Sequence, residues 1–221
     1  METSSPVFSA AVSDAGHVVS SLKVGGTGRP STLLADLIKE VLLLAGSELS
    51  QLDGFAVSIG PGSFTGLRVG VATVKTMAWA LKKPVLPVSS LEVLAHNLSI
   101  SSCQVSSFVD ARKAKVYTAR FSPDGPGNLK RLNEDQLLPP EEALLQCVAE
   151  TILVGDGIRR YRDLLAKAGK EWILAPEWSW IPSAEALCRI AAGRWPTGAV
   201  DDPHRLVPQY LYSQESDITG W

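Results

Sequence analysis

The sequence predicts an α/β protein of two lobes, on three observations. Strand pairs followed by helices that cross over to the next strand occur twice along the 221 residues. A glycine-rich turn within residues 58–70 joins a short apolar run to an amphipathic helix. A polar stretch of small residues, Ser99 to Cys103, is the best candidate for a boundary. We therefore expect a first lobe over residues 1–102 and a second lobe over residues 103–221, with the C-terminal segment a candidate to return to the first lobe.

The first lobe begins with a predicted hairpin and a helix. Val7 to Val12 and His17 to Val24 are apolar, β-rich runs on either side of a turn that contains Asp and Gly. A helix is expected over Thr32 to Ala45, with Ser31 as its cap and Gly46 at its end.

This helix carries a wide apolar arc: Leu33, Leu34, Leu37, Ile38, Val41, Leu42 and Leu44. Such an arc is wider than the apolar stripe that a helix needs to cover one side of a sheet. Two interpretations follow. The helix is buried inside its own lobe, or one flank is exposed for a partner.

The glycine-rich turn lies between a strand and a second helix. Phe55 to Ile59 has the composition of a covered parallel strand, and Gly60-Pro61-Gly62 forces a sharp turn. Ser63 or Thr65 can cap the following helix, whose unpaired N–H groups form a natural anion site. A Walker A loop does not fit, since no lysine follows the turn before Lys75, and a G-x-G-x-x-G motif that starts at Gly60 fails at Thr65. A structural turn is favoured over a phosphate-binding turn.

The second helix, expected over Gly66 to Leu81, has two distinct lines of side chains. The core stripe comprises Leu67, Val71, Val74, Ala78 and Leu81. A second line, small at its start, comprises Gly66, Gly70, Thr73, Met77 and Ala80. Each glycine costs roughly 1 kcal/mol of helix propensity relative to alanine, so a close-packed neighbour, in this chain or another, is the natural compensation.

The remaining elements complete the alternating pattern. The expected strands are Pro84 to Val88, Val105 to Val109, Val116 to Phe121 and Thr151 to Val154. The expected helices are Ser90 to Leu98, Pro139 to Ala149, Arg160 to Ala168 and Ser183 to Ala192. This order fits two lobes of ribonuclease H-like topology.

Several motifs, in order along nearly the whole chain, resemble the TsaB (YeaZ) family. The central one is Ser-Ile-Gly-Pro-Gly-Ser-Phe-Thr-Gly-Leu-Arg-Val-Gly at residues 58–70. Weaker matches are Glu2-Thr3-Ser4-Ser5, Asp110-Ala111-Arg112, Val154-Gly155-Asp156-Gly157 and Pro208-Gln209-Tyr210-Leu211. The resemblance implies a ribonuclease H-like fold of the actin-like ATPase superfamily.

The resemblance also implies a role. Members of this family are the bacterial partner subunit in threonylcarbamoyladenosine modification of tRNA, which bind and activate a TsaD-type enzyme through the two helices described above. A TsaE-type ATPase is the third expected member, and a homodimer through the same surface is an alternative assembly. The expected partner-binding residues are Leu34, Leu37, Ile38, Val41, Gly60, Pro61, Gly62, Ser63, Gly66, Arg68, Gly70, Thr73 and Met77.

The N-terminus departs from the family pattern. The chain starts at Met1-Glu2-Thr3-Ser4-Ser5, where the family has a complete apolar strand before the loop. In this fold the first strand is central, so its absence would leave two unpaired strand edges. The expectation is a natural protein with several more residues upstream, and poor stability for a chain that starts here.

The residues offer little for catalysis. His17, His96 and His204 form no helical two-histidine metal motif. Asp110, beside Arg112, is the best candidate for a carboxylate with a catalytic role, although an ion pair between these two residues or a turn cap is the favoured interpretation. Glu2 could be a remnant of a metal-phosphate site, but Ser4 and Ser5 replace the glycine that sugar kinases of the superfamily use there. We expect no catalytic residue, no metal and no cofactor of its own, with ATP or ADP at the junction of the complex.

Composition limits the partners. The net charge of -2 and the pI near 5.9 indicate that tRNA is contacted only indirectly. The basic run Arg159 to Lys170 is expected to be a solvated helix face, and the tryptophans Trp172, Trp178, Trp180 and Trp195 to be packing anchors. Cys103, Cys147 and Cys188 are expected to be reduced. No apolar run is long enough for a membrane span, and a cytoplasmic protein is expected. The competing classes are a small-molecule kinase of the same superfamily and, less favoured, a peptidase.

Overall fold

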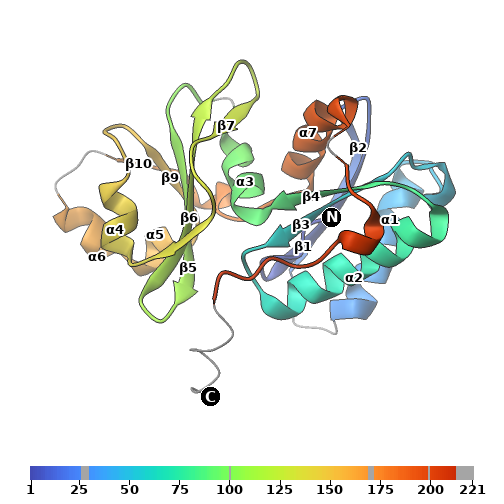
Figure 1. The fold of residues 1–221 in the computed structure, drawn as a ribbon, viewed down its shortest axis with the longest axis horizontal. Helices are drawn as coiled ribbons and strands as arrows, with labels where there is room; N and C mark the ends of the chain where they lie inside the picture. The colour runs from blue at the N-terminus through green and yellow to red at the C-terminus, as the bar shows by residue number, and fades with distance from the viewer. Residues whose placement is uncertain (26–29, 100, 169–171, 199, 213–221) are drawn as a thin grey trace. The chain divides into compact units, whose positions relative to one another are not determined.

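The computed structural model describes residues 1–25, 30–99, 101–168, 172–198 and 200–212, which form two compact units (Figure 1). Unit 1 comprises Met1–Val93 and Pro182–Pro208, and unit 2 comprises Leu94–Ile181 and the segment that begins at Gln209. The division therefore falls earlier than the expected boundary near residue 102, and residue 100 of that stretch lies outside the described residues.

Unit 1 contains two pairs of strands. β1 (Val7–Asp14) and β2 (His17–Gly25) form an antiparallel hairpin, while β3 (Phe55–Gly60) and β4 (Val85–Ser89) are parallel and are joined by helix α2 (Phe64–Leu81). Among the described residues, no strand pairing joins β1 directly to β3. The two pairs are bridged at one end by the first residues of the chain, because Glu2 pairs with Ser9 of β1 and Met1 bonds to β3.

Helices cover both sides of these strands (Figure 1). α1 (Pro30–Leu44) packs on Phe8, Ala10 and Val12 of β1, and α2 packs on β3. On the other side, α7 (Ala184–Arg194) packs on Leu86 and Val88 of β4. This contact explains why the chain returns to unit 1 near its end: the apolar face of α7 is buried there and not in the second lobe.

Unit 2 is built on a mixed six-stranded sheet. Its order is β10 (Ile173–Leu174), β9 (Ile152–Val154), β5 (Val105–Arg112), β6 (Lys115–Pro123) and β7 (Leu129–Arg131), and β8 (Gln136–Leu138) also pairs with β6. The helices of this part are α3 (Ser90–Ala95, which crosses the division), α4 (Pro140–Leu145), α5 (Gly157–Arg160) and α6 (Arg162–Lys167).

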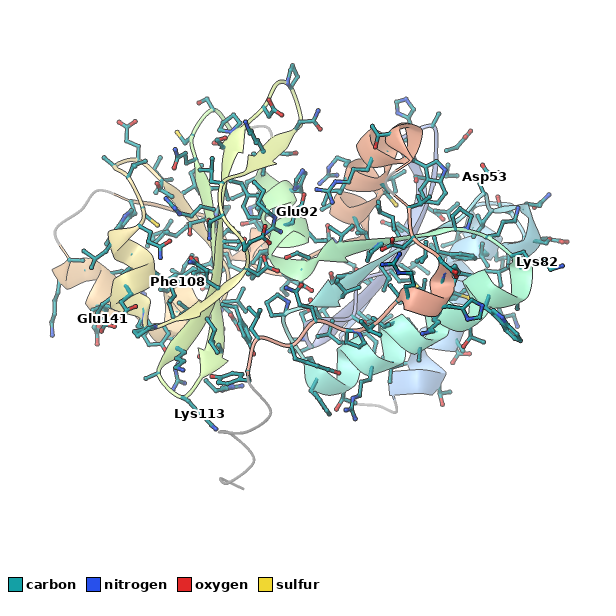
Figure 2. All side chains as sticks on the ribbon, viewed as in Figure 1. Asp53, Lys82, Glu92, Phe108, Lys113 and Glu141 are labelled. Carbon is teal, nitrogen blue, oxygen red and sulfur yellow. The ribbon has the colours of Figure 1, made fainter. Side chains whose placement is uncertain are left out.

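The core of unit 2 lies around one phenylalanine. Phe108 on β5 is completely buried and packs with Val116, Leu153 and Ile158 (Figure 2). Lys113, in contrast, lies at the turn between β5 and β6 (Figure 2). Tyr161 contacts the Phe108 ring edge-on, with 6.1 Å between ring centroids.

The sequence located most elements but erred at several ends. α2 begins at Phe64 rather than Gly66, and the expected helix Arg160 to Ala168 is interrupted at Tyr161. The helix expected to reach Ala149 ends at Leu145. The short strands β7, β8 and β10 were not predicted, because strands of two or three residues leave too little periodicity to detect. No helix in the described ranges is long and apolar enough to span a membrane.

Candidate functional site

The first residues of the chain pack against the glycine-rich turn and form a hydrogen bond with it. The Ser63 N–H donates to the carbonyl of Ser4 at 2.7 Å, and a Cβ atom on Gly62 would lie 2.4 Å from that same carbonyl oxygen. Gly60 and Pro61 are buried. The turn therefore requires glycine at residue 62 because the N-terminal loop approaches it closely.

The same turn begins α2 with a side-chain cap, as the sequence predicted. Ser63 Oγ accepts from the Gly66 N–H at 3.2 Å, and the Ser63 carbonyl accepts from the Leu67 N–H at 2.8 Å. Of the N–H groups that come before this first intrahelical bond, those of Ser63 and Gly66 already have partners within the chain. This geometry favours a structural turn over a phosphate-binding turn.

The close neighbour of the two helix glycines is in this chain. A Cβ atom on Gly66 would lie 2.0 Å from the Thr3 carbonyl oxygen, and one on Gly70 would lie 2.1 Å from Thr3 Oγ1. Both glycines are buried. The expectation that they contact a partner directly therefore requires correction: they allow the N-terminal loop to pack against α2.

Three residues expected to bind a partner through α1 belong instead to the core. Leu34 is completely buried, and Leu37 and Val41 are each 3% exposed. All three pack against β1. Ile38 is half-buried beside them. Most of the apolar arc is thus buried within unit 1, in line with one of the two interpretations of this helix. Leu43 and Leu44, at the end of α1, are 69% and 58% exposed.

The exposed side of α2 is formed by a different set of residues. We call it the outer face of α2, and it comprises Phe64, Thr65, Arg68, Ala72, Thr76 and Trp79. These residues share one side of the helix by their spacing of three, four and seven. Phe64 is 53% exposed and Trp79 is 61% exposed, which is unusual for large aromatic side chains.

Of the expected site residues on α2, only Arg68 is part of this face. Its guanidinium lies 3.8 Å from the centroid of the Phe64 ring, which fits a cation–π contact. Thr73 is half-buried and its hydroxyl donates to the Val69 carbonyl at 2.8 Å. Met77 is half-buried and packs against the core of α2 and β3. Sequence reasoning missed Phe64 and Trp79, although neither belongs to the core stripe Leu67, Val71, Val74 and Ala78.

Glu2 is enclosed rather than open to a ligand. It is completely buried, its Oε1 accepts from the Ser4 N–H at 2.5 Å, and its Oε2 accepts from the Ser58 hydroxyl. Burial raises the pKa of Glu2, and the hydrogen bonds from Ser4 and Ser58 act against this rise. Both carboxylate oxygens are engaged inside the chain, so the arrangement does not favour a metal-phosphate role.

Asp110 is held by its neighbours, as the favoured interpretation expected. Its carboxylate accepts from the Arg112 N–H at 3.0 Å and lies 3.7 Å from the Arg112 guanidinium and 3.5 Å from that of Arg160. The Asp110 N–H in turn donates to Asp156 at 2.9 Å. Burial, followed by the neighbouring Asp110 charge, raises the pKa of Asp156, and a hydrogen bond from the Asp110 N–H acts against it. This cluster fixes the end of β5.

The other candidate residues have structural surroundings. Arg159 pairs with Glu177 at 3.0 Å on the surface, consistent with a solvated helix face, and Lys170 lies outside the described residues. Trp172 and Trp180 pack on the unit 2 core and Trp195 on unit 1, whereas Trp178 is 76% exposed and is no packing anchor. The three cysteines form no disulfide, and the described residues hold no cluster of three or more metal-ligating side chains.

The comparisons with known proteins agree with this architecture. The chain is 28% identical to the "tRNA threonylcarbamoyladenosine biosynthesis protein TsaB" of Escherichia coli (strain K12), over 79% of this chain and 77% of that protein. It is 31% identical to the protein of the same description from Bacillus subtilis (strain 168), over 79% of this chain and 74% of that protein. A family model described as "TsaD: tRNA N6-adenosine threonylcarbamoyltransferase" matches residues 30–154.

Solved structures show the same fold. The solved structure described as YeaZ from Pseudomonas aeruginosa superposes with a TM-score of 0.84 at 28% identity, over 95% of this chain and 97% of that one. A second Pseudomonas aeruginosa structure, described as an uncharacterized protein with similarity to peptidase YeaZ, has a TM-score of 0.85 at 27% identity, over 96% of this chain and 97% of that one.

Fold and site together define a ribonuclease H-like protein of the actin-like ATPase superfamily, as the sequence predicted. In unit 1, this architecture carries a glycine-rich turn bonded to the N-terminal loop and an exposed face of α2. The chain belongs to the TsaB (YeaZ) family, and both of these relatives are described as tRNA threonylcarbamoyladenosine biosynthesis proteins.

Proposed function

We propose that this protein is a non-catalytic subunit that binds and activates a TsaD-type enzyme. That enzyme would form N6-threonylcarbamoyladenosine at position 37 of tRNAs that read ANN codons. The observation that carries the proposal is the outer face of α2, where Phe64 and Trp79 are more than half exposed on a helix whose other side is fixed to the core. Exposed aromatic side chains beside an arginine are typical of protein interfaces.

The close packing of α2 against the N-terminal loop supports a docking role. The N-terminal loop fills the space beside Gly66 and Gly70, and the cap at Ser63 sets the beginning of the helix. A rigid helix loses little conformational entropy when a partner binds. The outer face of α2 and the exposed end of α1, Leu43 and Leu44, would thus meet the partner as a preformed surface.

Further members of the assembly follow from the same proposal. A TsaE-type ATPase would join at or near the junction, where ATP or ADP would bind, and tRNA would be contacted only through the complex. The net charge of -2 supports an indirect role in tRNA binding. Without the partner, the same surface would support a homodimer. The protein would act in the cytoplasm, where tRNA is modified.

Reconstitution tests this function. The TsaD-type and TsaE-type proteins of the same organism are purified separately from this chain. They are then incubated, with and without this chain, with tRNA, threonine, bicarbonate and ATP and with an enzyme that makes threonylcarbamoyl-adenylate. Mass spectrometry of nucleosides measures the product. We expect product only when this chain is present, and none from this chain with tRNA and the adenylate alone. Product from this chain without the TsaD-type protein would contradict the proposal.

The kinase alternative is separated by titration calorimetry. A small-molecule kinase binds ATP and Mg²⁺ as an isolated chain, whereas a docking subunit need not. The burial of Glu2, with both oxygens bonded inside the chain, favours the docking subunit. Micromolar binding of ATP by the isolated protein would favour the kinase.

A further inference from the structure

The segment of residues 201–208, which we call the strap, lies along α2 in unit 1 (Figure 1). It begins beyond the C-terminal end of the helix, where Asp201 and Val85 exchange two backbone hydrogen bonds of 2.7 and 3.2 Å. The single helical turn that follows, Pro203–Arg205, contacts α2 directly. The strap is therefore a neighbour of the helix that carries the proposed docking surface.

Lys75 of α2 binds the strap. Its Nζ donates to the carbonyl of His204 at 2.9 Å and to the carbonyl of Leu206 at 3.1 Å. Leu206 is 3% exposed and packs in the core between α2 and β3. Two hydrogen bonds from a charged donor and one buried side chain thus fix the backbone of the strap against the helix.

The strap lies beside the outer face of α2. Lys75 follows Arg68 by seven residues and precedes Trp79 by four, so these three side chains lie on one side of the helix. Lys75 also follows Val71, a residue of the buried stripe, by four. The side chain that binds the strap therefore lies at the border between the buried stripe and the outer face.

The strap and α2 run in opposite directions. Asp201 lies at the C-terminal end of the helix, and residues 204–206 lie at Lys75, so the strap continues toward the N-terminal end. An extended chain advances about 3.3 Å per residue and an α-helix about 1.5 Å. Val207 therefore lies about one helical turn beyond Lys75, level with Ala72 at the middle of the outer face.

Val207 is exposed although the residue before it is buried. Leu206 is 3% exposed and Val207 is 63% exposed, as expected where successive side chains of an extended chain point to opposite sides. A single exposed valine needs no explanation, but a continuous apolar surface does. Along the helix, Val207 lies between the exposed rings of Phe64 and Trp79, and it extends their apolar surface from α2 to the strap. Arg205, two residues earlier, is exposed as well.

We propose that the strap is part of the docking surface for the TsaD-type protein. Val207 would pack against that protein beside Ala72, and Arg205 would pair with one of its carboxylates at the edge of the contact. The proposal rests on the proposed function, and the continuity of the strap with the outer face of α2 assigns both to the same partner. An apolar centre with a charged edge is the usual anatomy of a protein interface. Because Lys75 and Leu206 already fix the strap, it would meet the partner without rearrangement.

Two substitutions in the strap test this assignment, each with a matched control. Val207→Arg places a charged side chain in the expected contact, and Val148→Arg does the same at a valine of unit 2 that is 51% exposed. Arg205→Glu reverses a charge at the expected edge, and Arg162→Glu does so at an exposed arginine of α6. Titration calorimetry with the full chain measures binding of the TsaD-type protein, and urea denaturation checks that each variant is folded.

Val207→Arg should weaken binding by about tenfold or more. Arg205→Glu should weaken binding by about threefold or more and reduce its dependence on salt between about 0.05 and 0.5 M. Both controls should bind as the parent does. If Val207→Arg does not fold, Val207→Ser removes only the apolar contact and should weaken binding by about threefold.

Binding by Val207→Arg at the strength of the parent would overturn the proposal, whatever Arg205→Glu shows. Ala72→Arg separates this result from a failure of the proposed function. Weak binding by Ala72→Arg together with full binding by Val207→Arg would leave the docking surface on α2 and exclude the strap, whereas full binding by both would overturn both proposals. Loss of self-association by Val207→Arg in analytical ultracentrifugation, with full binding of the TsaD-type protein, would assign the strap to a second copy and overturn the proposal as well.

Discussion

Thr3 lies against Gly70: a Cβ atom on Gly70 would come 2.1 Å from Thr3 Oγ1 and 3.1 Å from Thr3 Cβ. The contact joins the N-terminal loop to the middle of α2, and Thr3 Oγ1 has no hydrogen-bond partner among the described residues. The two residues therefore meet through packing alone. A side chain at residue 70 has to displace the loop before any partner is involved.

This contact predicts that Gly70→Ala destabilises the free protein. Overpacking costs typically 1–3 kcal/mol, against a gain of about 1 kcal/mol in helix propensity, so we expect a net loss of about 1 kcal/mol. Thr3→Ala removes the atom that clashes and should recover part of the loss in the double variant. Urea denaturation measures all four proteins.

Gly66→Ala is the matched control for this cycle. Its Cβ atom would meet the Thr3 carbonyl oxygen at 2.0 Å, and a change of the Thr3 side chain leaves that oxygen in place. Thr3→Ala should therefore not rescue Gly66→Ala. Equal rescue of both glycine variants, or no loss of stability in either, would contradict the packing described here.

The same substitution on the two sides of α1 should have very different effects on stability. Leu34 is completely buried and Leu43 is 69% exposed. Leu34→Ala should lower the free energy of unfolding by about 2–5 kcal/mol, since it leaves a cavity in the core. Leu43→Ala should change it by no more than about 0.5 kcal/mol. Similar losses in the two variants, measured by urea denaturation, would be inconsistent with this assignment of the core.

Glu2 predicts a pH dependence of stability. Burial raises the pKa of Glu2 above its ordinary value of 4.5, so the folded protein holds this proton more tightly than the unfolded chain. The contribution of Glu2 to stability is then complete below pH 4.5 and is lost as the pH rises through the folded-state pKa. Glu2→Gln does not titrate. We expect the stability of the parent to fall relative to this variant as the pH rises, by at most about 1.4 kcal/mol per pH unit.

Urea denaturation between pH 4.5 and pH 8 measures this difference. The Met1 ammonium, whose pKa is lowered by burial, gives stability that rises with pH. It is present in both proteins, so its effect largely cancels in the comparison. Glu141→Gln, at an exposed carboxyl of α4, serves as the control. Parallel curves for the parent and Glu2→Gln would refute the prediction.

Periodicity and capping explain what the sequence predicted correctly. The spacing of Leu67, Val71, Val74 and Ala78 identified the buried stripe of α2, and Ser63 before that stripe identified its cap. Both signals are local, since a helix repeats its environment within a few residues. The strands β1, β3 and β5 were found in the same way, from apolar runs between turn residues.

What the sequence did not predict depends on contacts between distant residues. The spacing of Gly66 and Gly70 indicated a close neighbour but not which one, and the neighbour is Thr3, far from α2 in the sequence, near the start of the chain. Leu34 and Leu37 were assigned to a partner, because an apolar helix face has the same pattern whether β1 or another protein covers it. The exposure of Phe64 and Trp79 likewise depends on how α2 is oriented on β3.

The outer face of α2 gives the most direct test of the proposed docking surface. Ala72 is exposed near the middle of this face, one turn from Arg68 and one turn from Thr76. Ala72→Arg places a long charged side chain where a partner would pack, and should weaken binding of the TsaD-type protein by about tenfold or more. Because residue 72 is exposed, the free energy of unfolding should change by no more than about 0.5 kcal/mol.

Ala166→Arg is the matched control, since Ala166 is an exposed alanine in helix α6 of unit 2. It should leave binding of the TsaD-type protein unchanged in titration calorimetry. Self-association of the free subunit, measured by analytical ultracentrifugation, should be lost with Ala72→Arg if homodimer and heterodimer share the outer face of α2. A charge at the centre of a packed interface cannot remain solvated, so an arginine at residue 72 should weaken binding if the partner packs there. Tight binding by Ala72→Arg, or equal weakening of binding by both arginine variants, would place the docking surface elsewhere.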